Sequence, residues 1–245
     1  LPISSSGHLI LIPEFFGWHQ QSLAFDVIIH VATLGAIFVV LWEDIVSIGK
    51  GFISRRKSPE KTLGFMILCA TLPVIVVGLI FKDVIEDSLR NPTIVAVSLI
   101  VWGIVLYIAD RLVKRRAADS VKKIGWKAAI TIGFAQAIAL IPGTSRSGIT
   151  ITAGLFSGLN RETATRFSFL LGIPAIALAG LSAGYDLMSG QIDIAFLPLV
   201  VGFVTAFITG IITIQFLLAI VKKYSFVSFA AYRVILALFI LSVLV

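Results

Sequence analysis

The sequence predicts an all-α polytopic membrane protein with about six transmembrane helices and two re-entrant helical hairpins, arranged as an inverted-topology repeat. Three observations predict this fold. Of the 245 residues, 58% are hydrophobic and only 13% are charged, whereas soluble domains carry about 25% charged residues. Several apolar stretches reach the roughly 20 residues that a membrane-spanning helix needs. Two other apolar stretches are interrupted by proline, glycine and hydroxyl residues, which indicates broken segments rather than spans.

Six apolar stretches are long enough to be spans. They cover residues 23–42, 62–81, 93–110, 163–187, 194–221 and 226–245. The remaining two apolar segments do not fit as spans, because 1–16 is too short and 128–159 has a break in its middle. We therefore expect these two segments to enter the membrane without crossing it.

The distribution of charged residues orients the spans. The loops 43–61 and 111–127 are rich in lysine and arginine, whereas the loops 82–92 and 186–193 are mainly acidic. Cytoplasmic loops of membrane proteins carry the excess of positive charge, so the two basic loops are predicted to face the cytoplasm. This pattern accounts for the net charge of +7, and no nucleic-acid partner is expected.

Segment 128–159 is predicted to be a re-entrant hairpin. It must begin and end on the cytoplasmic side, because a basic loop precedes it and span 163–187 ends at an acidic loop. Its tip is IPGTSRSGIT, residues 141–150. By the same reasoning, LPISSSGH at residues 1–8 lies on the outer side. Two similar segments that enter from opposite faces form an inverted-topology repeat, whose broken elements meet near the bilayer midplane.

The repeat divides a single integral membrane domain, residues 1–245, into two halves. The halves are residues 1–112 and 128–245, and a cytoplasmic linker at 113–127 joins them. Each hairpin is followed by three spans, and Pro2 and Pro142 of the two similar stretches are 142 − 2 = 140 residues apart.

The tip of the second hairpin has the features of an anion site. Irregular backbone at membrane depth is tolerated only where it is buried in protein or lines a wet cavity. The small residues Ser145, Ser147 and Gly148 leave backbone amides accessible at the start of a helix, where an anion is favoured. Arg146 adds a planar fork suited to phosphate or carboxylate oxygens. An ionisable residue in a membrane segment is a functional candidate.

The first tip offers a nucleophile and a base. Serine is a poor nucleophile unless a base or an oriented anion site assists it. His8 follows Ser5 by about one helical turn, and imidazole suits proton transfer near neutral pH. The alternative is an N-cap serine followed by a buried, satisfied histidine. His30 is interpreted as a packing residue, with Asp26 as a candidate partner.

These features fit an anionic phosphate headgroup on a lipid tail, but they do not separate hydrolysis from transport. A lipid-phosphate or organic-anion transporter or flippase has the same architecture, although it needs no Ser-x-x-His pair. The SGH at residues 6–8 also suggests the type 2 phosphatidic acid phosphatase superfamily. That superfamily is disfavoured because Thr152 stands six residues after Arg146, where its motif has a histidine.

The chain resembles the undecaprenyl-diphosphate phosphatase family, also called the bacitracin-resistance protein family. The resemblance is carried by LPISSSGH at 1–8, PGTSRSGIT at 142–150, RFSFLLGIP at 166–174 and SFVSFAAYR at 225–233. It implies hydrolysis of undecaprenyl diphosphate to undecaprenyl phosphate plus inorganic phosphate, which recycles the lipid carrier for bacterial cell-wall synthesis and confers resistance to bacitracin. It further implies a multi-pass protein of the bacterial plasma (inner) membrane whose site opens to the outer face, with a homodimer as a candidate assembly.

The resemblance also implies roles for single residues. Ser5 takes the place of the nucleophile, His8 that of the essential histidine and Arg146 that of the phosphate-clamping arginine, while His8 as the nucleophile stays an alternative. The residues expected to bind substrate around them are Ser4, Ser6, Thr144, Ser145, Ser147, Gly148 and Thr150. A divalent cation, Mg²⁺ or Ca²⁺, is expected on family glutamates upstream of Leu1 rather than within the given sequence. We therefore expect the 245 residues to be a fragment that is inactive by itself.

Overall fold

The computed structural model describes residues 1–19, 21–54, 56–81, 84–85, 89, 91–113, 119–189 and 196–243, and its regular elements are all helices. They are α1 (Ser5–Phe16), α2 (Leu23–Val40), α3 (Trp42–Ile53), α4 (Pro59–Ile80), α6 (Pro92–Arg111), the 3₁₀ helix η1 (Val121–Lys123), α7 (Trp126–Ile138), α8 (Arg146–Phe156), α9 (Arg161–Met188), α10 (Phe196–Ile220) and α11 (Val227–Val243). The predicted all-α class is confirmed.

Four of the described helices are long and apolar enough to cross a membrane, namely α4, α6, α9 and α10. The pair α2 and α3 forms a fifth candidate, although the two helices are bent by 82° at their junction. α11 is shorter, with 17 residues. Each predicted span coincides with one helix apart from a few residues at its ends, and the polytopic membrane fold is confirmed. Among the described residues, however, at most five spans are long and apolar enough, against the six predicted.

The surface of α10 shows where lipid is expected. Only 6% of its spanning window is buried inside the protein. Its outward side chains include Phe196, Leu197 and Ile212, all of them large, apolar and exposed. A contiguous apolar surface of this kind is unfavourable in water, whereas a bilayer accepts it, because the backbone polar groups of a helix are satisfied internally.

The prediction that residues 43–61 form a loop is wrong, because most of this segment is helix α3. Its charged residues, such as Lys50, make it too polar to be recognised as a span. Ile45 and Ile48 nevertheless pack against the main core. Gly51 approaches α4 so closely that an added Cβ would lie 2.7 Å from the backbone nitrogen of Lys61. The chain therefore turns sharply after α2 and packs α3 back onto α4.

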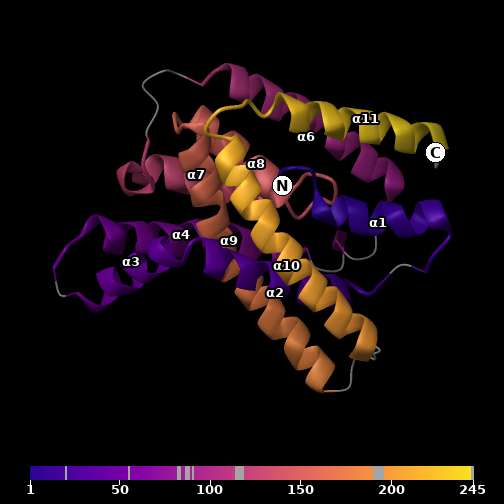
Figure 1. Cartoon of the computed structure of the whole chain (residues 1–245), viewed down its shortest axis with the longest axis horizontal. Helices are drawn as coiled ribbons and strands as arrows, with labels where there is room; N and C mark the ends of the chain where they lie inside the picture. Colours follow the sequence, from indigo (N-terminus) through magenta and orange to yellow (C-terminus); the bar gives the residue numbers. More distant parts are fainter. Residues whose placement is uncertain are drawn as a thin grey trace.

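The helix contacts follow the order of the two predicted halves. α2 packs on α9 and on α10, α4 packs on α9, and α6 lies beside α11 (Figure 1). In the predicted repeat, α2 corresponds to α9, α4 to α10 and α6 to α11. The contact of α2 with α10 is therefore equivalent to the contact of α9 with α4. The α2–α9 and α6–α11 contacts each join two corresponding helices. These contacts agree with the predicted inverted repeat, and the division into two halves stays a prediction.

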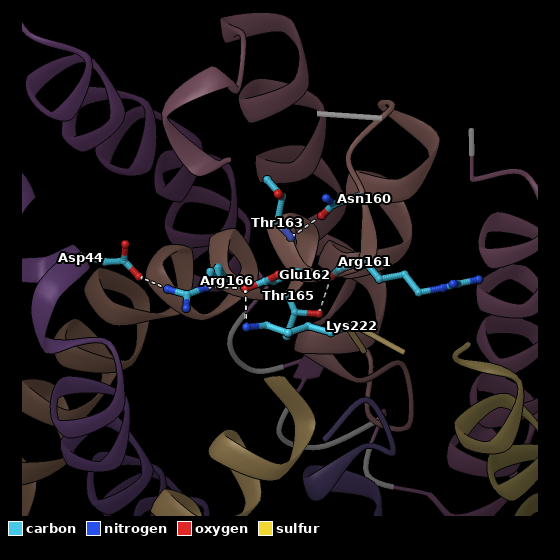
Figure 2. Close-up of polar contacts among 8 residues, drawn as sticks. All are labelled: Asp44, Asn160, Arg161, Glu162, Thr163, Thr165, Arg166 and Lys222. Atoms are coloured by element: carbon cyan, nitrogen blue, oxygen red, sulfur yellow. Dashed lines mark hydrogen bonds and ion pairs between the residues drawn. The ribbon is translucent and has the colours of Figure 1, made fainter. Parts of the chain in front are cut away.

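At the helix ends that the loop charges assign to the cytoplasm, an ion-pair cluster around the start of α9 is formed by Asp44, Glu162, Arg166 and Lys222 (Figure 2). Arg161 forms a separate pair with Asp110. Arg161 donates from Nη2 to Asp110 Oδ2 of α6 at 3.2 Å, and Arg166 donates to Asp44 of α3 at 2.7 Å. A further pair joins Lys222, after α10, to Glu162 at 3.4 Å. The Asp110 carboxylate is fully buried, so Arg161 neutralises a charge that would be costly alone. The cluster joins α9 to the ends of α3 and α10, and the Arg161–Asp110 pair joins α9 to the end of α6.

Candidate active site

The second hairpin has the predicted break between two helices. α7 ends at Ile138 and α8 begins at Arg146. Ser145 is the N-cap of α8: its backbone has φ +70° and its Oγ accepts a hydrogen bond from Gly148 N at 3.1 Å. The first amides of a helix have no partner inside the helix. The start of α8 is therefore a place where an anion is favoured.

The first tip repeats this arrangement. Ser4 is the N-cap of α1, again with φ +70°, and its Oγ accepts a hydrogen bond from Gly7 N at 3.2 Å. Ser4 and Ser145 are the only non-glycine residues with positive φ in the described part of the chain. Such backbone is strained by about 1–3 kcal/mol per residue and is concentrated at functional sites.

These caps define how the two tips correspond. Ser4 is equivalent to Ser145, and Gly7 is equivalent to Gly148. The N-cap serines are 145 − 4 = 141 residues apart, one more than the separation of Pro2 and Pro142. The second tip has one residue more between its proline and its N-cap serine, and only the cap geometry reveals where that residue is accommodated.

The two tips lie against each other and against α6. Ser147 Oγ donates a hydrogen bond to the carbonyl oxygen of Leu1 at 3.2 Å, and the N-terminus lies beside α8 in Figure 1. Gly7 and Gly143 come from different tips, yet an added Cβ at either would meet Val95 of α6. The predicted meeting of the two tips is thus present in the structure.

Neighbouring residues of α11 each hold one tip. The ring of His8 stacks parallel to that of Tyr232, with Nε2 2.7 Å from the tyrosine hydroxyl. Arg233 donates from Nη2 to the carbonyl oxygens of Gly143 and Thr144, at 3.1 and 2.8 Å. Our sequence reasoning gave neither α11 residue a role in the site. The available signal was the SFVSFAAYR stretch, whose last two residues are Tyr232 and Arg233.

Arg146 is held by α9 rather than by a carboxylate. Its Nη1 donates to the carbonyl oxygen of Ser168 at 2.9 Å. The guanidinium lies over Gly172, where a Cβ would overlap it. Ser168 and Gly172 belong to RFSFLLGIP and are one turn apart. Together they form the surface of α9 on which the Arg146 guanidinium lies, which we call the seat of Arg146. Within the described residues, no Asp or Glu forms an ion pair with Arg146.

Arg233 is fully buried, and its charge is also uncompensated by any carboxylate among the described residues. Its Nε and Nη1 have no hydrogen-bond partner in that part of the chain. Nη1 points towards the start of α8, because a Cβ on Gly148 would lie 2.7 Å from it. Arg146 and Arg233 therefore place two positive charges near the same helix start, where both favour an anion.

The predicted pairing of Ser5 with His8 is wrong. His8 Nδ1 lies 2.7 Å from the carbonyl oxygen of Ser4 and its Nε2 faces Tyr232, so both ring nitrogens are engaged elsewhere. Ser5 Oγ instead lies 3.2 Å from Nε2 of His30. The interpretation of His30 as a packing residue therefore missed this contact. Sequence spacing favours residues one turn apart, whereas His30 reaches Ser5 from another helix.

The other predicted binding residues divide by burial. Ser4, Thr144, Ser145 and Thr150 are buried, so they shape the two tips from within. Thr150 shares a hydrogen bond of 2.7 Å with Ser168 Oγ beneath Arg146. Ser5 is exposed, and Arg146 and Ser147 are half-buried, so these three remain accessible. The side chain of Ser6 lies outside the described part of the structure.

Among the described residues, no three His, Cys, Asp or Glu side chains gather in a way that suits a metal ion. A divalent cation prefers several oxygen ligands, mainly carboxylates and phosphates. The described residues therefore do not build a cation site by themselves.

The family assignment follows from comparisons with known proteins. The family described as Bacitracin resistance protein BacA matches residues 1–239. The chain belongs to this family. The predicted family resemblance is confirmed, and the four sequence stretches that carried it lie within the matched range.

Curated relatives of this BacA chain are named for one activity. The undecaprenyl-diphosphatase of Chlorobium phaeobacteroides (strain BS1) is 42% identical, over 100% of this chain and 91% of its own length. Undecaprenyl-diphosphatase 1 of Pseudoalteromonas translucida (strain TAC 125) is 40% identical, over 96% of this chain and 90% of its own. The undecaprenyl-diphosphatase of Marinobacter nauticus (strain ATCC 700491 / DSM 11845 / VT8) is 43% identical, over 100% of this chain and 93% of its own.

Proposed function

We propose that this protein hydrolyses undecaprenyl diphosphate to undecaprenyl phosphate and inorganic phosphate, recycling the lipid carrier of cell-wall synthesis and conferring resistance to bacitracin. Membership of the BacA family and the names of its relatives support the activity. The geometric observation that carries it is the meeting of two serine-capped helix starts. One bears the accessible hydroxyl of Ser5, and the other bears Arg146, which no Asp or Glu of the described residues pairs with.

Arg146 and the first amides of α8 are proposed to hold the diphosphate. Phosphoryl transfer is accelerated mainly by positioning and by stabilisation of charge on the phosphoryl oxygens. A guanidinium suits this task because its donors form a planar fork that binds two oxygens at once. The carbonyl of Ser168 uses one of these donors and fixes the orientation of the group.

Ser5 is proposed as the nucleophile that attacks the terminal phosphorus in line, while undecaprenyl phosphate leaves. Water then cleaves the phosphoserine and releases phosphate. The alternative of His8 as the nucleophile is less well supported, because its Nδ1 faces a carbonyl oxygen and its Nε2 faces the hydroxyl of Tyr232. A nucleophilic imidazole needs a free lone pair directed at phosphorus.

The transporter alternative has no support in the comparisons, whose relatives are named as diphosphatases. The bacterial inner membrane as the location, and a site open to its outer face, are further parts of the proposal. The basic residues around Arg161 and Arg166, which the positive-inside rule assigns to the cytoplasm, support that orientation. A homodimer is a separate proposal, which the molecular mass in detergent micelles would test.

A divalent cation, Mg²⁺ or Ca²⁺, is proposed to assist hydrolysis, although the described residues supply no ligand cluster for it. We expect a chelator to lower phosphate release by at least about tenfold, because charge neutralisation on a diphosphate is commonly a metal's task. The measurement is phosphate release with EDTA and after adding back each cation. Unchanged release in EDTA would remove the cation from the proposal.

The test of the activity uses the protein expressed from its full gene and purified in detergent. We expect phosphate release from undecaprenyl diphosphate, and no measurable release from Arg146→Ala. Arg166→Gln is the matched control, because Arg166 is paired with Asp44 in the ion-pair cluster rather than placed at a tip. A folded protein that binds the lipid without releasing phosphate would reject hydrolysis and favour transport.

A further inference from the structure

Ser5 and His30 bring together a hydroxyl group and an imidazole, the two groups that form a nucleophile and its base in many hydrolases. Ser5 Oγ lies 3.2 Å from His30 Nε2, and the two residues come from α1 and α2. The other ring nitrogen, Nδ1, lies 2.6 Å from the carbonyl oxygen of Asp26. The nucleophile therefore contacts the base, and a third group orients the base, which is the arrangement of activated hydroxyl nucleophiles.

The carbonyl oxygen of Asp26 decides where His30 carries its proton. A carbonyl oxygen has no hydrogen to donate, so Nδ1 must be the protonated nitrogen. In the neutral ring, Nε2 then has a free lone pair. That lone pair faces the Ser5 hydroxyl, which donates to it. The backbone of α2 thus holds the ring in the tautomer that accepts a proton from Ser5.

His8 is fixed in the same tautomer but faces a different hydroxyl. Its Nδ1 donates to the carbonyl oxygen of Ser4 at 2.7 Å, and its Nε2 accepts from Tyr232 at 2.7 Å. Both histidines therefore use a carbonyl four residues earlier to select the tautomer. Only His30 turns its accepting nitrogen towards the accessible serine. His8 joins the first tip to α11 instead.

We propose that His30 is the general base of the reaction, an inference that rests on the proposed hydrolase function and on Ser5 as its nucleophile. As the Ser5 Oγ–P bond forms, the Oγ proton passes to His30 Nε2. The bond from phosphorus to the bridging oxygen breaks, and undecaprenyl phosphate leaves with that electron pair.

In the second step, water adds to the phosphorus of phosphoserine. The Ser5 Oγ–P bond breaks, and Oγ takes back the proton from Nε2. Phosphate leaves carrying both hydrogens of the water, so neutral His30 and the Ser5 hydroxyl are restored. One imidazole therefore acts as base in the first step and as acid in the second.

The first test compares His30→Gln with wild type in purified protein, using undecaprenyl diphosphate as substrate. Glutamine can hydrogen-bond to Ser5 but does not accept its proton. We expect kcat to fall by about 10²–10⁴-fold, the usual contribution of a general base, with KM within about threefold. Thr33→Val is the matched control on α2, because Thr33 bonds the backbone carbonyl of His30 and not its ring. It is expected to retain wild-type kcat.

The second test asks whether His30 acts on the nucleophile's proton. The pKa of a cysteine thiol is several units below that of an alcohol, so a thiol needs little help from a base to become a nucleophile. In a Ser5→Cys background, His30→Gln should therefore lower kcat by less than about tenfold. His8→Gln should cost the same factor with either nucleophile, because His8 does not contact Ser5. A purely structural role of His30 would give equal losses in both backgrounds and would overturn the proposal.

Imidazole rescue provides a third readout if Ser5→Cys shows no turnover. Added imidazole is expected to raise the rate of His30→Ala in proportion to its neutral form, and no rise in a folded protein would reject the proposal. An active wild type with an inactive Ser5→Ala variant and an unimpaired His30→Gln variant would overturn only this inference. A wild type without phosphate release would overturn the proposed function instead.

Discussion

The two serine-capped tips share their backbone and differ in their chemistry. Ser4 and Ser145 have the same positive φ and the same cap onto a glycine three residues later. At the next position the first tip has Ser5, whose hydroxyl faces an imidazole, while the second has Arg146, which is held by a carbonyl. The same backbone conformation is therefore used twice, once at the serine that we propose as the nucleophile and once at a positively charged residue.

This difference teaches how a repeated fold can acquire a single active site. Phosphoryl transfer needs a positioned nucleophile and stabilisation of the phosphoryl charge at the same time. Two identical tips would duplicate one of these functions and lack the other. Because the tips meet beside Val95, each can supply in the proposed reaction the part that the other lacks.

The largest expected effect comes from removing the nucleophile of the first tip. Ser5→Ala should lower kcat for phosphate release by at least about 10³-fold, since loss of a covalent nucleophile removes its whole route. Ser5 is exposed, so the thermal unfolding midpoint in detergent should stay close to that of wild type. A kcat of Ser5→Ala within about tenfold of wild type would show that another residue is the nucleophile. It would also contradict the proposed difference in chemistry between the two tips.

The next effect comes from moving the charge of the second tip without removing it. In Gly172→Ala, the added methyl occupies the space of the Arg146 guanidinium. We expect phosphate release to fall by about 10²-fold, the cost of losing one oriented donor. Stability should not rise, because the preference of a helix for alanine over glycine, about 1 kcal/mol, is offset by loss of the charged hydrogen bond to Ser168, about 1.5–3 kcal/mol.

Gly184→Ala is the matched control for this variant. Gly184 lies on the same helix, and nothing is within 4 Å of its added Cβ. It should gain the same helix propensity and keep wild-type activity. Equal activity in the two variants would show that the seat of Arg146 is not required.

A smaller effect is expected behind the second tip. Arg233→Lys should lower the free energy of unfolding by about 2–3 kcal/mol, because a buried ammonium cannot reproduce the planar bonds to Gly143 and Thr144. Arg233→Met should lower the free energy of unfolding less, because this substitution also removes a buried charge that no described carboxylate balances. Thermal unfolding of both variants in detergent gives the order. A lysine variant more stable than the methionine variant would contradict the role of the planar fork.

The smallest effect concerns the shared caps. Ser4→Ala and Ser145→Ala should each cost about 1 kcal/mol of stability through the lost cap bond. Glycine at either position should cost less than alanine, because φ is positive there. Unfolding midpoints of the four variants test this. Equal losses at the two tips would support their equivalence, and an effect at only one would break it.

The sequence predicted the fold well because its signals are local. Span length, loop charge and the break at Pro142 and Gly143 depend on neighbouring residues and on the bilayer. Arg146 was likewise recognisable, because an arginine between apolar arms has few structural explanations. Helix α3 was missed since its charged residues resemble a loop, while its apolar face is meaningful only against α4.

Local patterns in the sequence were thus enough to predict the helical membrane fold and the two broken tips with their serine and arginine residues. The partners that these residues contact depend instead on how the helices pack. Spacing along one helix suggested His8 for Ser5, but the backbone carbonyl of Ser4 and the hydroxyl of Tyr232 engage that ring. His30, from α2, takes the place instead. The physical reason is that the direction of a side chain depends on contacts between helices distant in sequence, which no local pattern records.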